Sequence, residues 1–207
     1  MQAAKIIELA NEPLVRHAVL SGQASQAATF FDANPKFVSQ VCKSLVAWFR
    51  ASWGTQQQDW SNLMALRHIF TLPAIQYKVY RSVNLTGRFK LGQSVRYKGK
   101  NNRPIDSWST SQISAKEFGG RYLLVSEVST AFVVFDRRIL KIIQATVPMC
   151  RNKTVKSLMH ATVEDIADYY ASSGGPVGGQ NEVIVASGAY KGGMPCKIAY
   201  IDPDWSA

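Results

Sequence analysis

The spacing of apolar residues changes near residue 73, and this change constrains the fold more than any other feature of the sequence. Before it, apolar side chains recur every three or four residues, which places them on one face of an amphipathic helix. In the segment 36–50 they are Phe37, Val41, Leu45, Trp48 and Phe49. Asn34 and Pro35 suit the start of this helix. Weaker patterns predict helices at about residues 3–20, 23–31 and 57–71, with Pro73 ending the last.

Short runs of β-branched and aromatic residues, separated by glycines, follow this point. The runs lie at 75–83, 107–111, 121–128, 131–136, 140–147, 181–188 and 196–202. Their length and composition predict strands. One further helix is expected at 162–171, where Thr162 and Asp165 have capping-box spacing. Helices followed by strands indicate an α+β fold. We expect a single domain over 1–207, with a helical part at 1–73 and a mainly β core at 74–207.

The 207 residues are enough to bury the core of one domain. No apolar run reaches the 18 or so residues of a membrane helix, and Glu8 and Glu12 interrupt the region where a signal peptide would be apolar. Three widely spaced cysteines make a disulfide framework unfavourable. These features predict a soluble, cytoplasmic protein without a membrane partner. The three histidines lack metal-ligand spacing, so no metal is expected.

The formal net charge of +10 favours a polyanionic partner, either nucleic acid or an acidic protein surface. Its alternative meaning is solubility alone. The segment 86–103 interleaves Phe89 and Tyr97 with cations, a mixture that suits backbone phosphates and a stacked base. The cations are Arg88, Lys90, Arg96, Lys98, Lys100 and Arg103. A solvated basic hairpin is the alternative for this segment.

Arg81 is the first of three polar intrusions into the apolar runs. Side chains alternate along a strand, so Arg81 shares a face with Tyr77 and Val79, where burial normally excludes a charge. A guanidinium in such a place needs an anionic partner, and its planar fork suits a carboxylate or phosphate. The alternative is an ordinary structural salt bridge.

A row of serine hydroxyls is the second intrusion. Ser107, Ser109 and Ser111 fall on one face of the predicted strand at 107–111. Ser114 and Glu117 then have capping-box spacing, and the glycines at 119 and 120 would end a short helix. A polar edge strand followed by a turn is the alternative.

Gln180 and Glu182 form the third intrusion, at the start of the apolar run Val183–Val185. Period-two geometry makes the two side chains project together at the rim of a buried sheet. A carboxylate in this place can stabilise a cationic sugar centre, while the amide orients an incoming nucleophile. Glycosyl transfer through an oxocarbenium-like transition state needs this arrangement of charge.

The three intrusions together resemble a known signature. The matching motifs are Tyr80-Arg81-Ser82, Ser109-Thr110-Ser111 and Gln180-Asn181-Glu182. In this order they resemble mono-ADP-ribosyltransferases of the Arg-Ser-Glu class in its Gln-x-Glu variant, a class that includes bacterial toxins and phage-encoded modifiers. The resemblance covers about residues 77–190. It implies a mixed, mainly antiparallel two-sheet core on which the helical part packs, and NAD as the substrate.

The resemblance also implies roles in NAD binding. Arg81 would grip an NAD phosphate or the nicotinamide ribose, and Ser82 would present its backbone to the nicotinamide amide. Thr110 and Ser111 would shape the nicotinamide pocket. Phe118 would lie against nicotinamide, and Arg121 would lie near the phosphates.

The catalytic roles implied by the resemblance centre on Glu182. Glu182 would bind the ribose 2′-hydroxyl and stabilise the oxocarbenium as nicotinamide leaves, with Ser109 holding its carboxylate. Gln180 would orient the acceptor. The glycine-rich segment 171–179 would be a mobile, target-recognising loop. Family members often carry an aromatic residue three positions before the glutamine, where this chain has Val177.

The acceptor is expected to be a base of RNA or DNA. In the family, Glu-x-Glu goes mainly with arginine acceptors, whereas Gln-x-Glu is similar to enzymes that modify other side chains or guanine bases. The positive charge then favours nucleic acid. Three alternatives stay open: transfer to a host protein, plain NAD hydrolysis, and a basic nucleic-acid-binding module without catalysis. A toxin or phage effector of this kind could be accompanied by an antitoxin.

Overall fold

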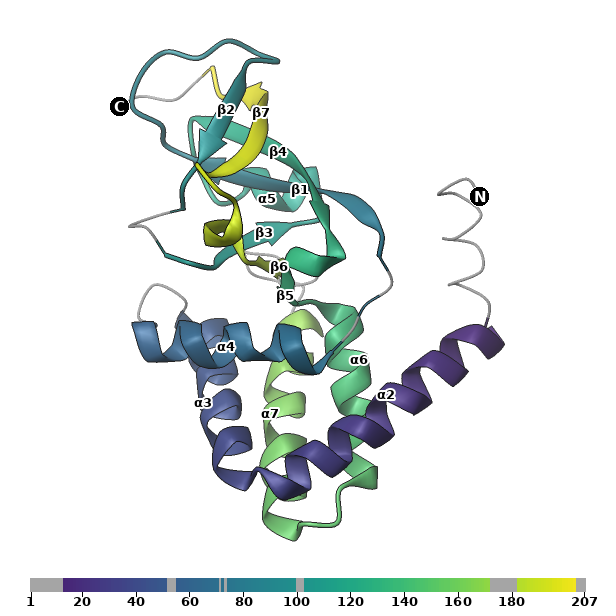
Figure 1. Cartoon of the computed structure of the whole chain (residues 1–207). Helices are drawn as coiled ribbons and strands as arrows, with labels where there is room; N and C mark the ends of the chain where they lie inside the picture. Colours follow the sequence, from purple (N-terminus) through teal and green to yellow (C-terminus); the bar gives the residue numbers. More distant parts are fainter. Residues whose placement is uncertain are drawn as a thin grey trace. The chain divides into compact units, whose positions relative to one another are not determined.

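The computed structural model describes residues 13–51, 55–70, 72, 74–99, 103–171 and 182–203 (Figure 1). The fold is α+β, with N-terminal helices and one seven-stranded antiparallel sheet. Contacts between residues divide the chain into two compact units. The helical unit lies within 1–71 and 137–167, and the sheet unit lies within 72–136 and 168–207.

Among the described residues, five helices form the helical unit. They are α2 (Pro13–Ala33), α3 (Pro35–Ala51), α4 (Gln57–Ile69), α6 (Arg137–Thr146) and α7 (Lys153–Ala171), the last extending into the sheet unit. The helices predicted from the N-terminal spacing are confirmed within the described residues, with one difference. α2 runs through residues 20–23 without a break, because a glycine at position 22 does not by itself end a helix.

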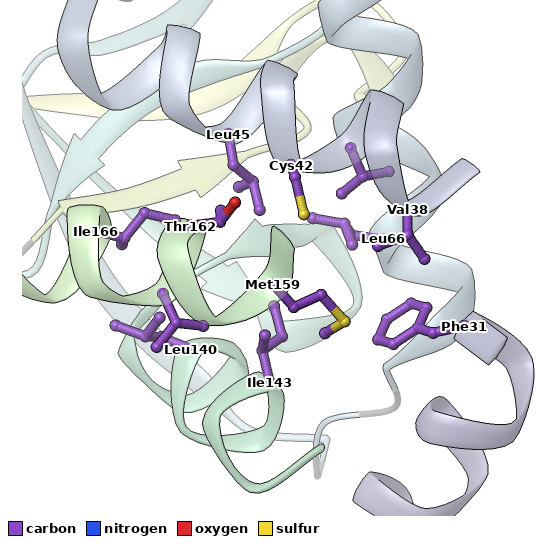
Figure 2. A pocket seen from close by; sticks show the side chains of 12 residues that line it. Phe31, Val38, Cys42, Leu45, Leu66, Leu140, Ile143, Met159, Thr162 and Ile166 are labelled. Atoms are coloured by element: carbon purple, nitrogen blue, oxygen red, sulfur yellow. The ribbon is translucent and has the colours of Figure 1, made fainter. Parts of the chain in front are cut away.

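The core of the helical unit is the apolar stripe that the helix spacing predicts. Val41, Leu45 and Trp48 of α3 are all buried. A small apolar cavity of about 20 Å³ is lined by side chains of α2, α3, α4, α6 and α7. Figure 2 shows these side chains around it. That volume is about the size of one water molecule, so the cavity is a packing defect rather than a ligand site.

The strand predicted at residues 140–147 is wrong, because these residues belong to α6. Their isoleucines suggested a strand, but the buried set has helical spacing once residue 139 is included. The buried residues of α6 are Ile139, Leu140, Ile142, Ile143 and Thr146. The core at 74–207 therefore contains two substantial helices.

The helix expected at 162–171 begins nine residues earlier, at Lys153. The Asn152 side chain accepts hydrogen bonds from the backbone of Thr154 and Val155 at 3.0 and 3.3 Å, so Asn152 caps this end. Thr162 lies inside the helix, where its hydroxyl donates to the Leu158 carbonyl.

The sheet contains seven strands in the order β2-β7-β4-β1-β3-β6-β5. They are β1 (Gln76–Val83), β2 (Ser94–Tyr97), β3 (Asp106–Ser109), β4 (Tyr122–Ser129), β5 (Val133–Phe135), β6 (Glu182–Val185) and β7 (Met194–Ile201). All neighbouring strands pair antiparallel. The predicted two-sheet core is therefore wrong. The pair Tyr80–Ser109 hydrogen-bonds β1 to β3 and makes the ladder continuous.

β2 was not predicted, because it lies inside the basic segment 86–103 and has only four residues. It forms one edge of the sheet. Among the described helices, none combines the length and apolarity needed to cross a membrane. Cys42, Cys150 and Cys196 are buried and unpaired, and burial raises the pKa of each thiol.

Candidate functional site

The three polar intrusions lie on three adjacent strands of the sheet. Tyr80 of β1 is the register partner of Ser109 of β3, and Ser109 is the partner of Glu182 of β6. Residues directly opposite each other in an antiparallel pair project from the same face. Tyr80, Ser109 and Glu182 therefore form one transverse row, although 102 positions separate the first from the last in sequence.

The same row continues toward the β2 edge. Val125 of β4 is the partner of Tyr80, Lys197 of β7 is the partner of Val125, and Ser94 of β2 is the partner of Lys197. Lys197 is exposed, whereas Glu182 is buried. One face of the sheet thus leads from a buried carboxylate to an exposed cation.

Glu182 is the most constrained carboxylate of this face. Its side chain is only 8% exposed, and each oxygen accepts a hydrogen bond from a hydroxyl. Ser107 Oγ donates to Oε1 at 2.6 Å, and the Tyr169 hydroxyl donates to Oε2 at 2.9 Å. Burying a charge is unfavourable unless such bonds replace its hydration. The two donors come from different elements, β3 and the end of α7, so they also fix the orientation of the carboxylate.

The resemblance assigns Ser109 to hold Glu182, but in the structure Ser107 makes this hydrogen bond. Ser107 and Ser109 share a face of β3, as the alternation predicted, and Trp108 between them is buried on the other. The Ser109 hydroxyl instead accepts from the Ser111 backbone at 3.0 Å. Ser109 is thus opposite Glu182 in the ladder while its hydroxyl is used in the turn that follows β3.

The short helix predicted after the serines is confirmed as α5 (Gln112–Lys116), but its cap lies one turn earlier than expected. Ser111, rather than Ser114, is the N-cap, and its hydroxyl accepts from the Ser114 backbone at 3.2 Å. Gly119 adopts φ +65°, a conformation that favours glycine after a helix. Thr110 is exposed at the same turn.

Arg81 has its anionic partner inside the protein. Its Nη2 lies 3.5 Å from Oδ1 of Asp106, a residue only 3% exposed, and its Nη1 donates to the Ser107 carbonyl. The Arg81 side chain is 21% exposed. This is the structural salt bridge that the sequence left open as an alternative. Tyr80 projects from the same face of the sheet as Glu182, so the side chain of its neighbour Arg81 points to the opposite face. Arg81 is linked to the site by its hydrogen bond to the Ser107 carbonyl.

The hydroxyls of Tyr97 and Ser187 also lie beside the Asp106 carboxylate. Ser187 Oγ donates to Asp106 Oδ2 at 2.6 Å, and the Tyr97 hydroxyl lies 3.5 Å from Oδ1. The Arg81 guanidinium also lies over the Tyr97 ring, 5.6 Å from its centroid. Burial raises the pKa of Tyr97 to about 12 despite the neighbouring Arg81 charge. The phenol therefore stays protonated and available as a donor.

The remaining predicted residues lie around α5. The Ser82 hydroxyl donates to the Gly120 carbonyl at 3.2 Å. Phe118 is 46% exposed, and the Arg121 guanidinium lies 5.3 Å from the centroid of the Tyr122 ring. Gln180 and the predicted loop at 171–179, apart from the backbone of Ala171, lie outside the described residues.

The aromatic residues of the basic segment make ring contacts within the protein, and stacking of a base on them stays a prediction. Tyr97 is buried against Trp108, with ring centroids 5.5 Å apart. Phe89 packs edge-on against Tyr122 at 5.4 Å. The cations around them remain at the surface: Arg88, Lys90, Arg96 and Lys98 are exposed.

No sequence motif indicated a role for Tyr169 or Asp106. Tyr169 lies 13 positions before Glu182 on a helix, and no short motif links the two residues. Burial, followed by the nearby Glu182 charge, raises the pKa of Tyr169 well above its ordinary value. Asp106 had a weak signal, since it is an acidic residue directly before the strand in which the serines alternate.

Within the described residues, no group of three histidine, cysteine or acidic side chains is arranged to hold a metal ion. Comparisons of the chain with protein-family models, with curated proteins and with solved structures found no match.

Proposed function

We propose that the protein is an NAD-dependent mono-ADP-ribosyltransferase that transfers ADP-ribose to a base of RNA or DNA. The observation that carries the proposal is the Glu182 carboxylate, buried at the start of β6 and oriented by Ser107 and Tyr169. A preorganised negative charge of this kind is what an oxocarbenium-like transition state requires.

In the proposed reaction the bond between C1′ of the ribose and the nicotinamide nitrogen breaks, and its electron pair leaves with nicotinamide. Positive charge then develops on the ribose. A carboxylate has about four acceptor positions, of which Ser107 and Tyr169 use two. In the proposed reaction the carboxylate also accepts a hydrogen bond from the ribose 2′-hydroxyl and stabilises the cation. A nitrogen or oxygen of the acceptor base then bonds to C1′ and loses its proton to solvent.

Arg81 contributes to this site by stabilising the position of β3. Its pairing with Asp106 and its hydrogen bond to the Ser107 carbonyl fix the strand from which Ser107 reaches Glu182. Direct contact between Arg81 and an NAD phosphate, as the resemblance implies, requires the guanidinium to share its donors with Asp106. A guanidinium has five N–H donors, so such sharing is chemically feasible.

The face of the sheet supports a nucleic-acid acceptor. Lys197 lies four strands from Glu182 along the transverse row, a distance of about 19 Å at the usual spacing between strands. Tyr80 lies between them, half-buried, and Arg96 lies two residues beyond Ser94 on the same face. An aromatic ring with cations further along is an arrangement that suits a single strand.

Labelled NAD tests the choice of acceptor. The protein is incubated with NAD labelled in the adenylate part and with separate pools of RNA, single-stranded DNA and protein. We expect label in one of the nucleic-acid pools, and its loss with Glu182→Gln. Label confined to protein would instead support a protein acceptor, and ADP-ribose released without any labelled polymer would indicate a hydrolase.

A further inference from the structure

Tyr169 of the helix α7 contacts the candidate catalytic carboxylate, Glu182. It lies near the C-terminal end of that helix, in the part of the chain assigned to the sheet unit. Its side chain is half-buried, and its hydroxyl donates to Oε2 of Glu182 at 2.9 Å.

The position of this hydroxyl decides what it can do. Ser107 occupies the other oxygen, Oε1, at 2.6 Å. With one hydrogen-bond donor, a glutamate carboxylate can still rotate about its Cγ–Cδ bond. Donors on both oxygens fix the plane of the carboxylate. Each carboxylate oxygen has two acceptor positions, so one donor on an oxygen does not by itself prevent a second hydrogen bond to it. The contact with Tyr169, together with that of Ser107, therefore orients the Glu182 carboxylate.

Tyr169 also keeps its proton while it does so. Burial and the adjacent Glu182 charge raise the pKa of the phenol, so it remains a donor through neutral and moderately alkaline pH. A phenol that ionised would place a second negative charge beside Glu182 and repel it.

Resting on the proposed function, we propose that Tyr169 is a positioning residue for ADP-ribosyl transfer: its hydroxyl, together with that of Ser107, holds the Glu182 carboxylate in the orientation that the transition state needs. Tyr169 acts through Glu182 and makes no contact with NAD in this proposal. Its loss therefore lowers the rate of the chemical step rather than the affinity for NAD.

The test compares nicotinamide release by the wild type and by Tyr169→Phe, which keeps the ring and removes the hydroxyl. We expect kcat to fall about 10- to 100-fold, the usual effect of losing a hydrogen bond to a charged group, with KM for NAD unchanged. Tyr190→Phe is the control, because it removes the same hydroxyl from a ring that stacks on Phe132, with centroids 4.3 Å apart. This control should retain the wild-type rate.

A merely structural role is distinguished by a second measurement. In a Glu182→Gln background, the change Tyr169→Phe should cause no further loss, because its effect passes through the carboxylate. Ser107→Thr, which retains a hydroxyl, should keep more activity than Ser107→Ala. Thermal unfolding establishes that each variant is folded.

Each outcome gives a decision. If Tyr169→Phe has the same kcat as an active wild type, the role of Tyr169 is overturned while the proposed function stands. An equal fold-loss from Tyr169→Phe with and without Glu182 would assign the hydroxyl to structure alone and also overturn it. Absence of nicotinamide release by the folded wild type, with each of the nucleic-acid and protein pools, would overturn the proposed function and this inference with it.

Discussion

A carboxylate removed from water needs hydrogen bonds in place of its hydration, and Glu182 receives them from Ser107 and Tyr169. At the scale of single residues, this explains why Ser107 matters more to the site than its position outside the Ser-Thr-Ser motif suggests. The alternation of β3 correctly placed Ser107 and Ser109 on one face. It could not tell which hydroxyl reaches Glu182, because that depends on the turn in which Ser111 engages Ser109.

Ser107→Ala is therefore expected to lower nicotinamide release about 10- to 100-fold, since it removes one hydrogen bond to a charged group. Ser109→Ala should have a smaller effect on the rate, because its hydroxyl bonds to the Ser111 backbone instead. Initial rates of the two variants measured side by side check this order. A larger loss from Ser109→Ala would show that the role implied by the resemblance is the correct one.

Arg81→Met should destabilise the protein, because it removes the cation paired with the buried Asp106. Breaking a buried pair costs about 3–5 kcal/mol, and partial exposure of Arg81 reduces our expectation to about 2 kcal/mol. Urea unfolding measures the change. Arg50→Met is the comparison, since Arg50 forms an exposed pair with Asp165 at 3.0 Å and should change stability by less than about 0.5 kcal/mol.

At the scale of elements, short-range signals decided which parts of the fold could be predicted. The helix α3 follows from local periodicity and the strand β1 from local composition, and both are present. α6 was misassigned because its isoleucines have high strand propensity, and tertiary packing overrode that propensity. β2 is held by pairing with β7, a partner about 100 positions away that local sequence does not reveal.

The two glycines at positions 120 and 22 give an element-scale test of packing. A Cβ on Gly120 would lie 2.5 Å from the backbone nitrogen of Val83, so the turn that leads into β4 could not keep its present approach to the end of β1. We expect Gly120→Ala to destabilise the protein by about 1–3 kcal/mol. A Cβ on Gly22 meets nothing within 4 Å, so Gly22→Ala should stabilise α2 by about 0.5–1 kcal/mol. Opposite signs in thermal unfolding are the expected result, and equal destabilisation would contradict it.

At the scale of the whole molecule, the sequence predicted the α+β class but not the division of the chain into two compact units. Residues 137–167 return to the helical unit after five strands, and no compositional boundary marks this return. The convergence of β1, β3 and β6 could be inferred from the ordered motifs. The contribution of Tyr169 could not, because it arises from the path of a long helix back to the sheet.

The charge of +10 predicts that affinity for nucleic acid decreases steeply with salt. Fluorescence anisotropy with a single-stranded oligonucleotide should give a linear decrease of log affinity with log salt concentration. Lys197→Gln should lower the magnitude of the slope by about 0.7, the value for one contact with a single strand. Lys43→Gln on the exposed face of α3 should leave it unchanged. Equal effects of the two changes would indicate nonspecific attraction rather than binding along the face of the sheet that carries Glu182 and Lys197.

The most direct test of the account is the rate at which the protein releases nicotinamide from NAD in the presence of nucleic acid, measured for the wild type, Glu182→Gln and Glu127→Gln. Glu127 is an exposed glutamate of β4, so it controls for the loss of one negative charge. The proposed function predicts release by the wild type and by Glu127→Gln, and a loss of a hundredfold or more, about 3 kcal/mol, with Glu182→Gln. Equal release by all three proteins would contradict it.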